Sequence, residues 1–185
     1  MVLVDLHEGL LLDPPMVAWA GHDGWRLVTP CNVEAADPRT ERFDADRCPL
    51  LAEVATWEDR EFQDFLGLFA SITAKAKIAR PWEQMMDRKQ LHDVGELTLS
   101  NGAKTKLWQF EKKRTAIRLV WVYGGGKRVL LATHAFLKRQ SKTPADERER
   151  AAGTARQFFG SVEQGTARLV YEQGGRLGFE VLYGK

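Results

Sequence analysis

The chain of 185 residues has few cysteines and no long apolar run, and each of these shortages excludes a class of protein. Two cysteines, Cys31 and Cys48, are too few for a disulfide framework or a cysteine-rich zinc site. No apolar run approaches the roughly 20 residues that a membrane-spanning helix needs. The first residues lack the basic start and small-residue cleavage site of a secretory signal. We therefore expect a cytoplasmic protein with reduced thiols.

What is present is the composition of an ordinary globular domain, with 44% hydrophobic and 28% charged residues. Internal repeats and low-complexity segments are missing, which excludes solenoids and disordered tracts. At this length we expect one domain, with or without extensions, and a core of useful size.

The formal net charge of +2 hides a strong asymmetry along the chain. Residues 1–62 hold five cations and thirteen acids, a net charge of −8. Residues 101–160 hold fourteen cations and four acids, a net charge of +10. Such a basic segment is typical of a surface that contacts phosphate groups.

Strand patterns dominate the second half of the chain. Two apolar runs, 117–123 and 129–136, flank Gly124-Gly125-Gly126 and predict an antiparallel hairpin. The glycines form a turn rather than a phosphate loop, because no helix follows them. A further strand is expected at 106–111, and a final hairpin at 167–183 around Gly174-Gly175. A short strand at 25–29 is also possible from the pattern Trp-Arg-Leu-Val-Thr.

Helices are expected in three places. A strand at 50–55 leads into a helix with Thr56 as its N-cap, and its buried stripe consists of Phe62, Phe65, Leu66, Phe69 and Ile72. A second helix is expected to begin at Pro81, and a third to run from Thr143-Pro144 to about residue 159. Residues 93–105 are predicted to be rich in turns.

The expected order is a strand, two helices, three strands and a helix. This order predicts an α+β fold in which a small, mostly antiparallel sheet packs on an N-terminal helical hairpin. An acidic N-terminal extension (1–47) and a C-terminal hairpin extension (160–185) would flank this domain (48–159).

The basic segment also carries a family resemblance. The run from Arg118 to Pro144 includes Leu130-Leu131, His134-Ala-Phe, Lys138-Arg139 and Lys142-Thr-Pro. With the element order, this spacing resembles the RelE/HigB toxin superfamily, most closely its phage-derived HigB-like branch, over about residues 48–159. The resemblance implies an endoribonuclease that cuts mRNA, often on the ribosome, without metal or cofactor. It also implies a neutralising antitoxin, usually of the helix-turn-helix type.

The resemblance implies roles for several residues. Cleavage by attack of a 2′-hydroxyl on its own phosphate requires proton transfer and stabilisation of extra negative charge. The implied catalytic residues are Arg118, for the phosphate, and His134, as general acid or base. The implied RNA-binding residues are Lys106, Lys112, Lys138, Arg139 and Lys142.

Other interpretations stay open at this stage. Arg118 alternates with apolar neighbours and is also compatible with a solvent-facing position, and His134 with a hydrogen-bonded core histidine. Glu111 stands where the family usually has a cation, which favours a non-catalytic module that binds RNA or protein. The acidic residues 1–47 would alternatively fold over the basic face as a built-in antitoxin mimic, or serve as plain structural packing.

Overall fold

The computed structural model describes residues 1–11, 24–33, 43–112, 114–125, 128–139, 142–173 and 176–183. Its strands are β1 (Val2–Asp5), β2 (Arg26–Pro30), β3 (Leu91–Thr98), β4 (Lys104–Glu111), β5 (Ile117–Tyr123), β6 (Val129–Leu137), β7 (Arg168–Gln173) and β8 (Arg176–Val181). Its α-helices are α1 (Pro49–Val54), α2 (Asp59–Ala76), α3 (Trp82–Met85) and α4 (Ala145–Glu163). Short 3-10 turns lie at Glu8–Leu11 and Ala45–Arg47.

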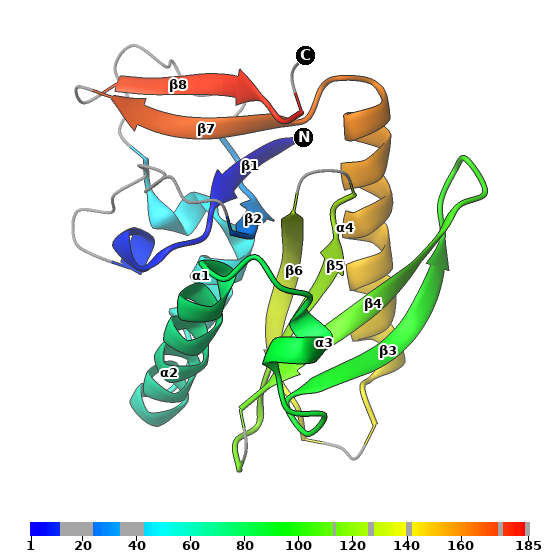
Figure 1. The fold of residues 1–185 in the computed structure, drawn as a ribbon. Coiled ribbons are helices and arrows are strands. Elements are labelled where there is room, and N and C mark those ends of the chain that lie inside the picture. The colour runs from blue at the N-terminus through cyan, green and yellow to red at the C-terminus, as the bar shows by residue number, and fades with distance from the viewer. Residues whose placement is uncertain are drawn as a thin grey trace.

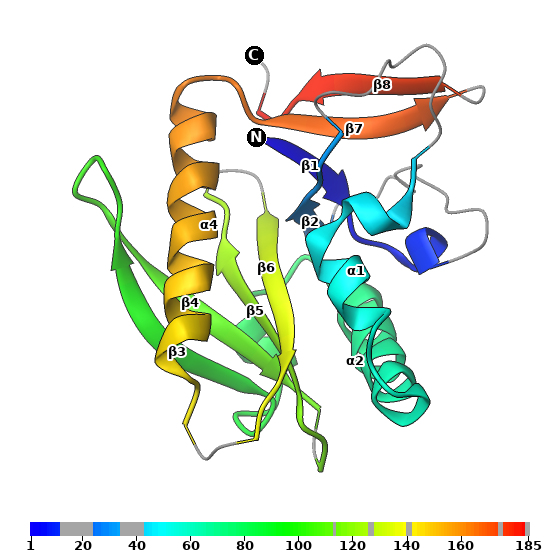
Figure 2. The same ribbon diagram turned by 180° about the vertical axis from the view of Figure 1, so that it is seen from behind.

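All of these strands form one eight-stranded sheet in the order β3-β4-β5-β6-β2-β1-β7-β8 (Figure 1). The sheet is mixed, because β2 pairs with β6 and β1 pairs with β7 in parallel, while the other pairings are antiparallel. Seen from the opposite side, α4 crosses in front of β3 and β4, while α1 and α2 lie beside β6 (Figure 2).

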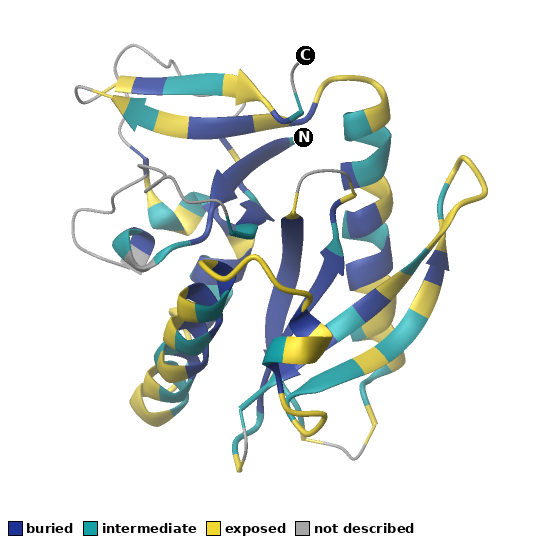
Figure 3. Cartoon of the chain, in the orientation of Figure 1, coloured by how far each residue is buried: buried dark blue, intermediate teal, exposed yellow. Residues whose placement is uncertain are grey.

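Helices cover both faces of the sheet, and the alternation along β5 shows how. Leu119 and Trp121 point into one core with α1, α2 and α3, whereas Val120 and Val122 point into a second core with α4. The strand is therefore apolar on both sides, as a central strand with two covered faces must be. Burial is densest along β5 and β6 and falls toward the strand ends and the β3–β4 hairpin (Figure 3).

The expected fold class is wrong. The sheet is not small and mostly antiparallel but has eight strands of mixed direction, and no helical hairpin packs on it within the described residues. α2 is a single long helix, and the helix expected at Pro81 is only the short α3, with Pro81 as its N-cap. The segment expected as a strand at 50–55 is α1, because Pro49 occupies the first turn of a helix there.

Much of the local secondary structure is nevertheless confirmed. The hairpin of β5 and β6, the strand β4, the helices α2 and α4 and the hairpin of β7 and β8 all lie where the pattern predicts them. The N-cap of α2 is wrong by two residues: Glu58 caps it, with Glu61 completing a capping box, and Thr56 donates to Glu53 O.

The two ends of the chain build part of the same sheet. β1 and β2 lie between β6 and β7, so these residues of the acidic N-terminal segment are strands of the sheet. They do not cover the basic residues 101–160 as a separate layer. Residues 12–23 and 34–42 of that segment lie outside the described residues. Among the described residues, no helix has the length and apolar character to cross a membrane.

Candidate functional site

Four strand ends meet at one end of the sheet, where β3 and β5 begin and β4 and β6 end. Backbone bonds tie the adjoining loops together: Glu111 donates to Gln90 O (2.8 Å), and Lys138 donates to Ala116 O (2.8 Å). A side-chain bond from Thr143 Oγ1 to Gln109 Oε1 (2.9 Å) fixes the segment that leads into α4. Segments far apart in the sequence thus form one polar surface, which we call the strand-end surface.

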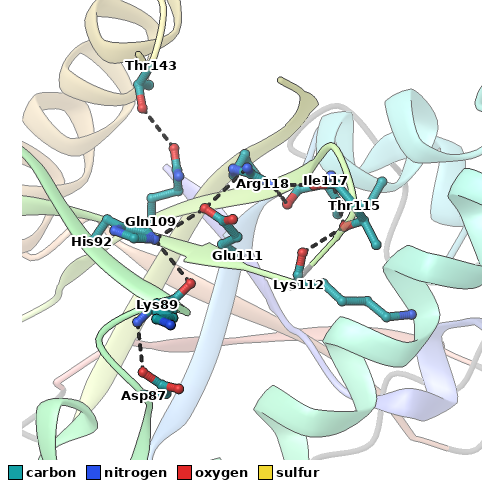
Figure 4. A network of polar contacts seen from close by, with 10 residues as sticks. All are labelled: Asp87, Lys89, His92, Gln109, Glu111, Lys112, Thr115, Ile117, Arg118 and Thr143. Carbon is teal, nitrogen blue, oxygen red and sulfur yellow. Dashed lines mark hydrogen bonds and ion pairs between the residues drawn. The ribbon is translucent and has the colours of Figure 1, made fainter. Parts of the chain in front are cut away.

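A histidine, a carboxylate and a guanidinium converge there (Figure 4). Glu111 Oε2 lies 3.2 Å from His92 Nε2 and 3.2 Å from Arg118 Nη2. The side chains of His92, Glu111 and Arg118 are 39%, 22% and 9% exposed, respectively. The exposed fraction falls from the histidine inward, so the imidazole is the member of the trio that a solute meets first.

Arg118 is held rigidly at the base of this trio. Its Nη1 donates to Thr115 O (2.9 Å) and Ile117 O (2.8 Å), and its Nη2 faces Glu111. Burial lowers the pKa of the guanidinium and Glu111 opposes that shift, so Arg118 remains charged at any physiological pH. The Nε atom is buried and has no hydrogen-bond partner among the described residues. The Nε–H donor of the Arg118 guanidinium is therefore unsatisfied.

His92 has a defined ring orientation. Its Nε2 lies 3.3 Å from Lys89 O and 3.2 Å from Glu111 Oε2, and both atoms are acceptors. Nε2 must therefore carry the proton, which leaves Nδ1 of the neutral ring as an acceptor. A carboxylate that fixes a histidine tautomer and stabilises its protonated form is the arrangement that proton-transfer sites use.

Two members of the trio, His92 and Glu111, line an open pocket of about 510 Å³ together with Arg88, Lys89 and Arg114. Arg118 does not line the pocket and contacts it through Glu111. Arg88, Lys89 and Arg114 are exposed, and none of the three has an acidic partner among the described residues. Arg114 adopts a positive φ of 65°, in the tight turn between β4 and β5. The pocket thus combines a histidine–carboxylate pair with uncompensated positive charge, which suits an anionic ligand.

The residues expected to bind RNA divide into two groups. Lys138, Arg139 and Lys142 lie on the strand-end surface, and Arg139 and Lys142 are exposed. Lys112 and Lys106 instead belong to the opposite face of β4. Lys112 Nζ pairs with Asp64 of α2 (2.7 Å).

Lys106 is paired as well. Its Nζ pairs with Asp93 Oδ2 (2.8 Å) and lies over the Trp108 ring, 5.6 Å from the centroid. Each of these two lysines has a carboxylate neighbour that already compensates its charge.

His134 lies in a different environment from His92. Its side chain is 1% exposed beneath α4, and Nδ1 lies 3.0 Å from Thr133 Oγ1, which itself donates to Val120 O. Burial, with a smaller effect of Arg150, lowers the pKa of His134 to about 3. Nε2 lies 3.1 Å from Glu147 Oε2, yet the pair lacks hydrogen-bond geometry, and we treat the ring as neutral. The structure thus places Arg118 behind Glu111, which lines the pocket, and leaves His134 in the core.

Sequence analysis missed His92 and the pocket cations Arg88, Lys89 and Arg114. One signal in the sequence points to His92. Asn101-Gly102 is a hairpin turn, so a strand that pairs with β4 is expected just before it. Counting back across that turn would place His92 opposite Phe110, but a bulge between Asp93 and Gly95 shifts the register by one residue, so that His92 pairs with Gln109 and lies near Glu111.

Comparison of the chain with protein-family models, with curated proteins and with solved structures gave no match. A function for this protein therefore has to be inferred from the residues of the strand-end surface.

Proposed function

We propose that the protein binds RNA at the strand-end surface and cleaves it without a metal ion. The single observation that carries the proposal is the pair of His92 and Glu111, held by Arg118, at an open pocket that three further cations also line. A base, a group that orients it and a fixed cation are the parts that cleavage by an internal 2′-hydroxyl requires.

In the proposed reaction, His92 Nδ1 accepts the proton of the ribose 2′-hydroxyl while Glu111 stabilises the imidazolium that forms. The 2′ oxygen forms a bond to phosphorus, and the bond from phosphorus to the 5′ oxygen breaks. The leaving 5′ oxygen takes a proton from the imidazolium or from water. The products are a 2′,3′-cyclic phosphate and a 5′-hydroxyl. The exposed cations Arg88, Lys89 and Arg114, which line the pocket, would stabilise the extra negative charge on the phosphorus centre, and Arg118 would hold Glu111 in place.

The surrounding cations would hold the RNA backbone on both sides of the pocket. Arg88 and Lys89 precede β3, Arg114 lies between β4 and β5, and Lys138 and Lys142 follow β6. This spread over several segments suits a chain of phosphates rather than one isolated anion.

The proposed biological setting is the one that the resemblance to the RelE/HigB superfamily implies. The substrate would be mRNA, free or on the ribosome, in the cytoplasm. Expression without a neutralising partner, such as a helix-turn-helix antitoxin, would arrest growth.

One observation favours a second function, a module that binds RNA without cutting it. Arg118 already donates to two carbonyls and faces Glu111, so few of its donors remain for a phosphate. Glu111 also places a negative charge beside the pocket, which opposes the binding of a phosphate close to the guanidinium.

The test is incubation of the purified protein with single-stranded RNA in the presence of EDTA, followed by analysis of the ends of the products. We expect fragments with 2′,3′-cyclic phosphates and 5′-hydroxyls from RNA, and no cleavage of the same oligonucleotide with 2′-deoxyriboses. The matched variants are His92→Gln, which removes the proton acceptor at the pocket, and His134→Gln, which changes the buried histidine.

Fragments from the wild type and from His134→Gln, but not from His92→Gln, would support cleavage at the pocket. Intact RNA that still binds the protein would overturn cleavage and leave the binding module. Failure to bind RNA at low salt would overturn both functions.

A further inference from the structure

The sheet ends in two edge strands, β3 and β8, and these edges differ. β3 has a bulge between Asp93 and Gly95 and carries the acids Asp93 and Glu96. Bulges and charges are the devices by which proteins prevent further strands from pairing. β8 pairs with β7 in an unbroken register and has no bulge. Its outer edge is therefore suited to accept another strand.

The outer edge of β8 has a defined set of backbone groups that bond to none of the strands the structure describes. Leu182 N donates to Ala167 O (2.8 Å), and the register pairs Glu180 with Leu169 and Gly178 with Tyr171. Because bonded residues alternate in an antiparallel pair, the even-numbered residues of β8 bond to β7. The N–H and C=O groups of Leu177 and Phe179 consequently point away from the sheet.

We propose that a second copy of the chain pairs with this edge, β8 against β8, antiparallel about a two-fold axis at Gly178. In this register, Leu177 exchanges both backbone hydrogen bonds with Phe179 of the second copy, and so does Phe179 with Leu177 of the second copy. Arg176 then stands opposite Glu180 of the second copy at both ends of the shared segment. The strand is thus complementary to itself in charge as well as in hydrogen bonding.

The exposed side chains near the outer edge of β8 are compatible with pairing to a second copy of the chain. Arg176 is exposed and has no acidic partner among the described residues, and the Glu180 side chain is 52% exposed although it accepts a bond from Arg26 (3.0 Å). Tyr171 and Val181 are unusually exposed for apolar side chains, at 39% and 48%. Pairing would cover part of this apolar surface and join the two sheets into one.

Gly178 also suits the position at the axis. The Tyr171 ring occupies the space that a side chain would need, because a Cβ atom at Gly178 would lie 2.4 Å from it. The strand thus has no protruding side chain at its midpoint, where the two copies come closest.

Cross-linking tests the register directly. Residue 176 of one copy and residue 180 of the other form a non-hydrogen-bonded pair, whose Cα atoms are about 4.5 Å apart, a distance that a disulfide spans. We expect an equal mixture of Arg176→Cys and Glu180→Cys proteins to form a disulfide-linked heterodimer under mild oxidation. Either variant alone should not cross-link at this edge, and the native Cys31 and Cys48 are buried. No cross-link in the mixture, or equal cross-linking of either variant alone, would overturn the register.

A second variant tests whether the outer edge of β8 is required for dimerisation. Phe179→Pro removes an outward N–H and leaves the bonds between β7 and β8 in place, so the hairpin should persist. We expect the wild type to form a dimer in sedimentation experiments and Phe179→Pro to dissociate at least about tenfold more readily. Equal masses for the two proteins over the whole concentration range, whether monomer or dimer, would overturn the proposal.

Discussion

Among the described residues, two histidine–glutamate pairs lie on the same face of one sheet, and they differ in how open they are to a solute. His92 and Glu111 lie 3.2 Å apart at the pocket, and His134, beneath α4, lies 3.1 Å from Glu147 of that helix. The His92 side chain is 39% exposed, whereas that of His134 is 1% exposed. Nearly equal distances thus accompany different environments, because burial keeps the His134 ring neutral whereas His92 is reachable from solvent.

The largest expected difference between the pairs is in catalysis. His92→Gln should lower the rate of RNA cleavage by about 10²–10⁴-fold, the usual effect of losing a general base or acid. His134→Gln should leave the rate per folded molecule little changed, since the ring does not reach the pocket. The measurement is single-turnover cleavage of a labelled RNA in EDTA. A comparable loss in both variants would show that the two histidines act together.

For the free energy of unfolding, His134 is expected to matter more than His92. His134→Ala should lower the free energy of unfolding by about 2–4 kcal/mol, because it leaves a cavity under α4 and removes the contact with Thr133. His92→Ala should cost about 0.5 kcal/mol, as is usual for a partly exposed position. Urea unfolding at pH 7.5 measures both, and a larger loss in His92→Ala would contradict the assignment of the two environments.

The pairs should also differ in how stability depends on pH. The pKa of His134 is about 3 in the folded protein and ordinarily 6.5, so the unfolded chain binds a proton first as the pH falls. Stability due to this group is complete above pH 6.5 and is lost progressively toward pH 3, by about 2 kcal/mol between pH 7 and pH 5. Burial raises the pKa of Glu147, whose protonation offsets part of this loss.

The matched variant for this effect is His134→Leu, which should flatten the decline between pH 7 and pH 5. Unfolding by urea at the two pH values gives the comparison. An unchanged decline in His134→Leu would assign the pH dependence to other groups.

The smallest expected effect concerns the lysines. Replacing Lys138 and Lys142 by alanine should reduce the dependence of RNA affinity on salt by about 0.7 in log–log slope for each phosphate that the protein no longer neutralises. Lys106→Ala should leave the slope unchanged, because Lys106 is paired with Asp93 on the opposite face. Titration of a fluorescent RNA at several salt concentrations tests this, and an equal effect of Lys106→Ala would place the RNA elsewhere.

Local patterns predicted many elements but not their assembly. The alternation along β5 and β6 and the apolar stripe of α2 identified those elements correctly. The fold class was wrong because β1, β2, β7 and β8 join the central sheet through pairings between distant segments. Short strands of four to six residues have little periodicity of their own, so their partners are decided by packing.

The candidate site, like the fold, was predicted only in part from the sequence. Arg118 was proposed from the family resemblance, and the cations of the basic segment stood out by their number. His92 was not, because β3 was hidden in a segment with many turn-forming residues, and the partner that gives His92 its role is on the next strand. Glu111, which stood as a departure from the expected pattern, became meaningful only beside His92.

The sequence by itself determined the basic character of residues 101–160, the hairpin of β5 and β6, and the helices α2 and α4, because charge and periodicity are local properties of the chain. Only the tertiary structure decided which histidine meets solvent and which strand ends the sheet. Burial depends on what α4 covers, and an edge depends on which strand finds no partner. These are relations between segments far apart in sequence, which no local pattern encodes.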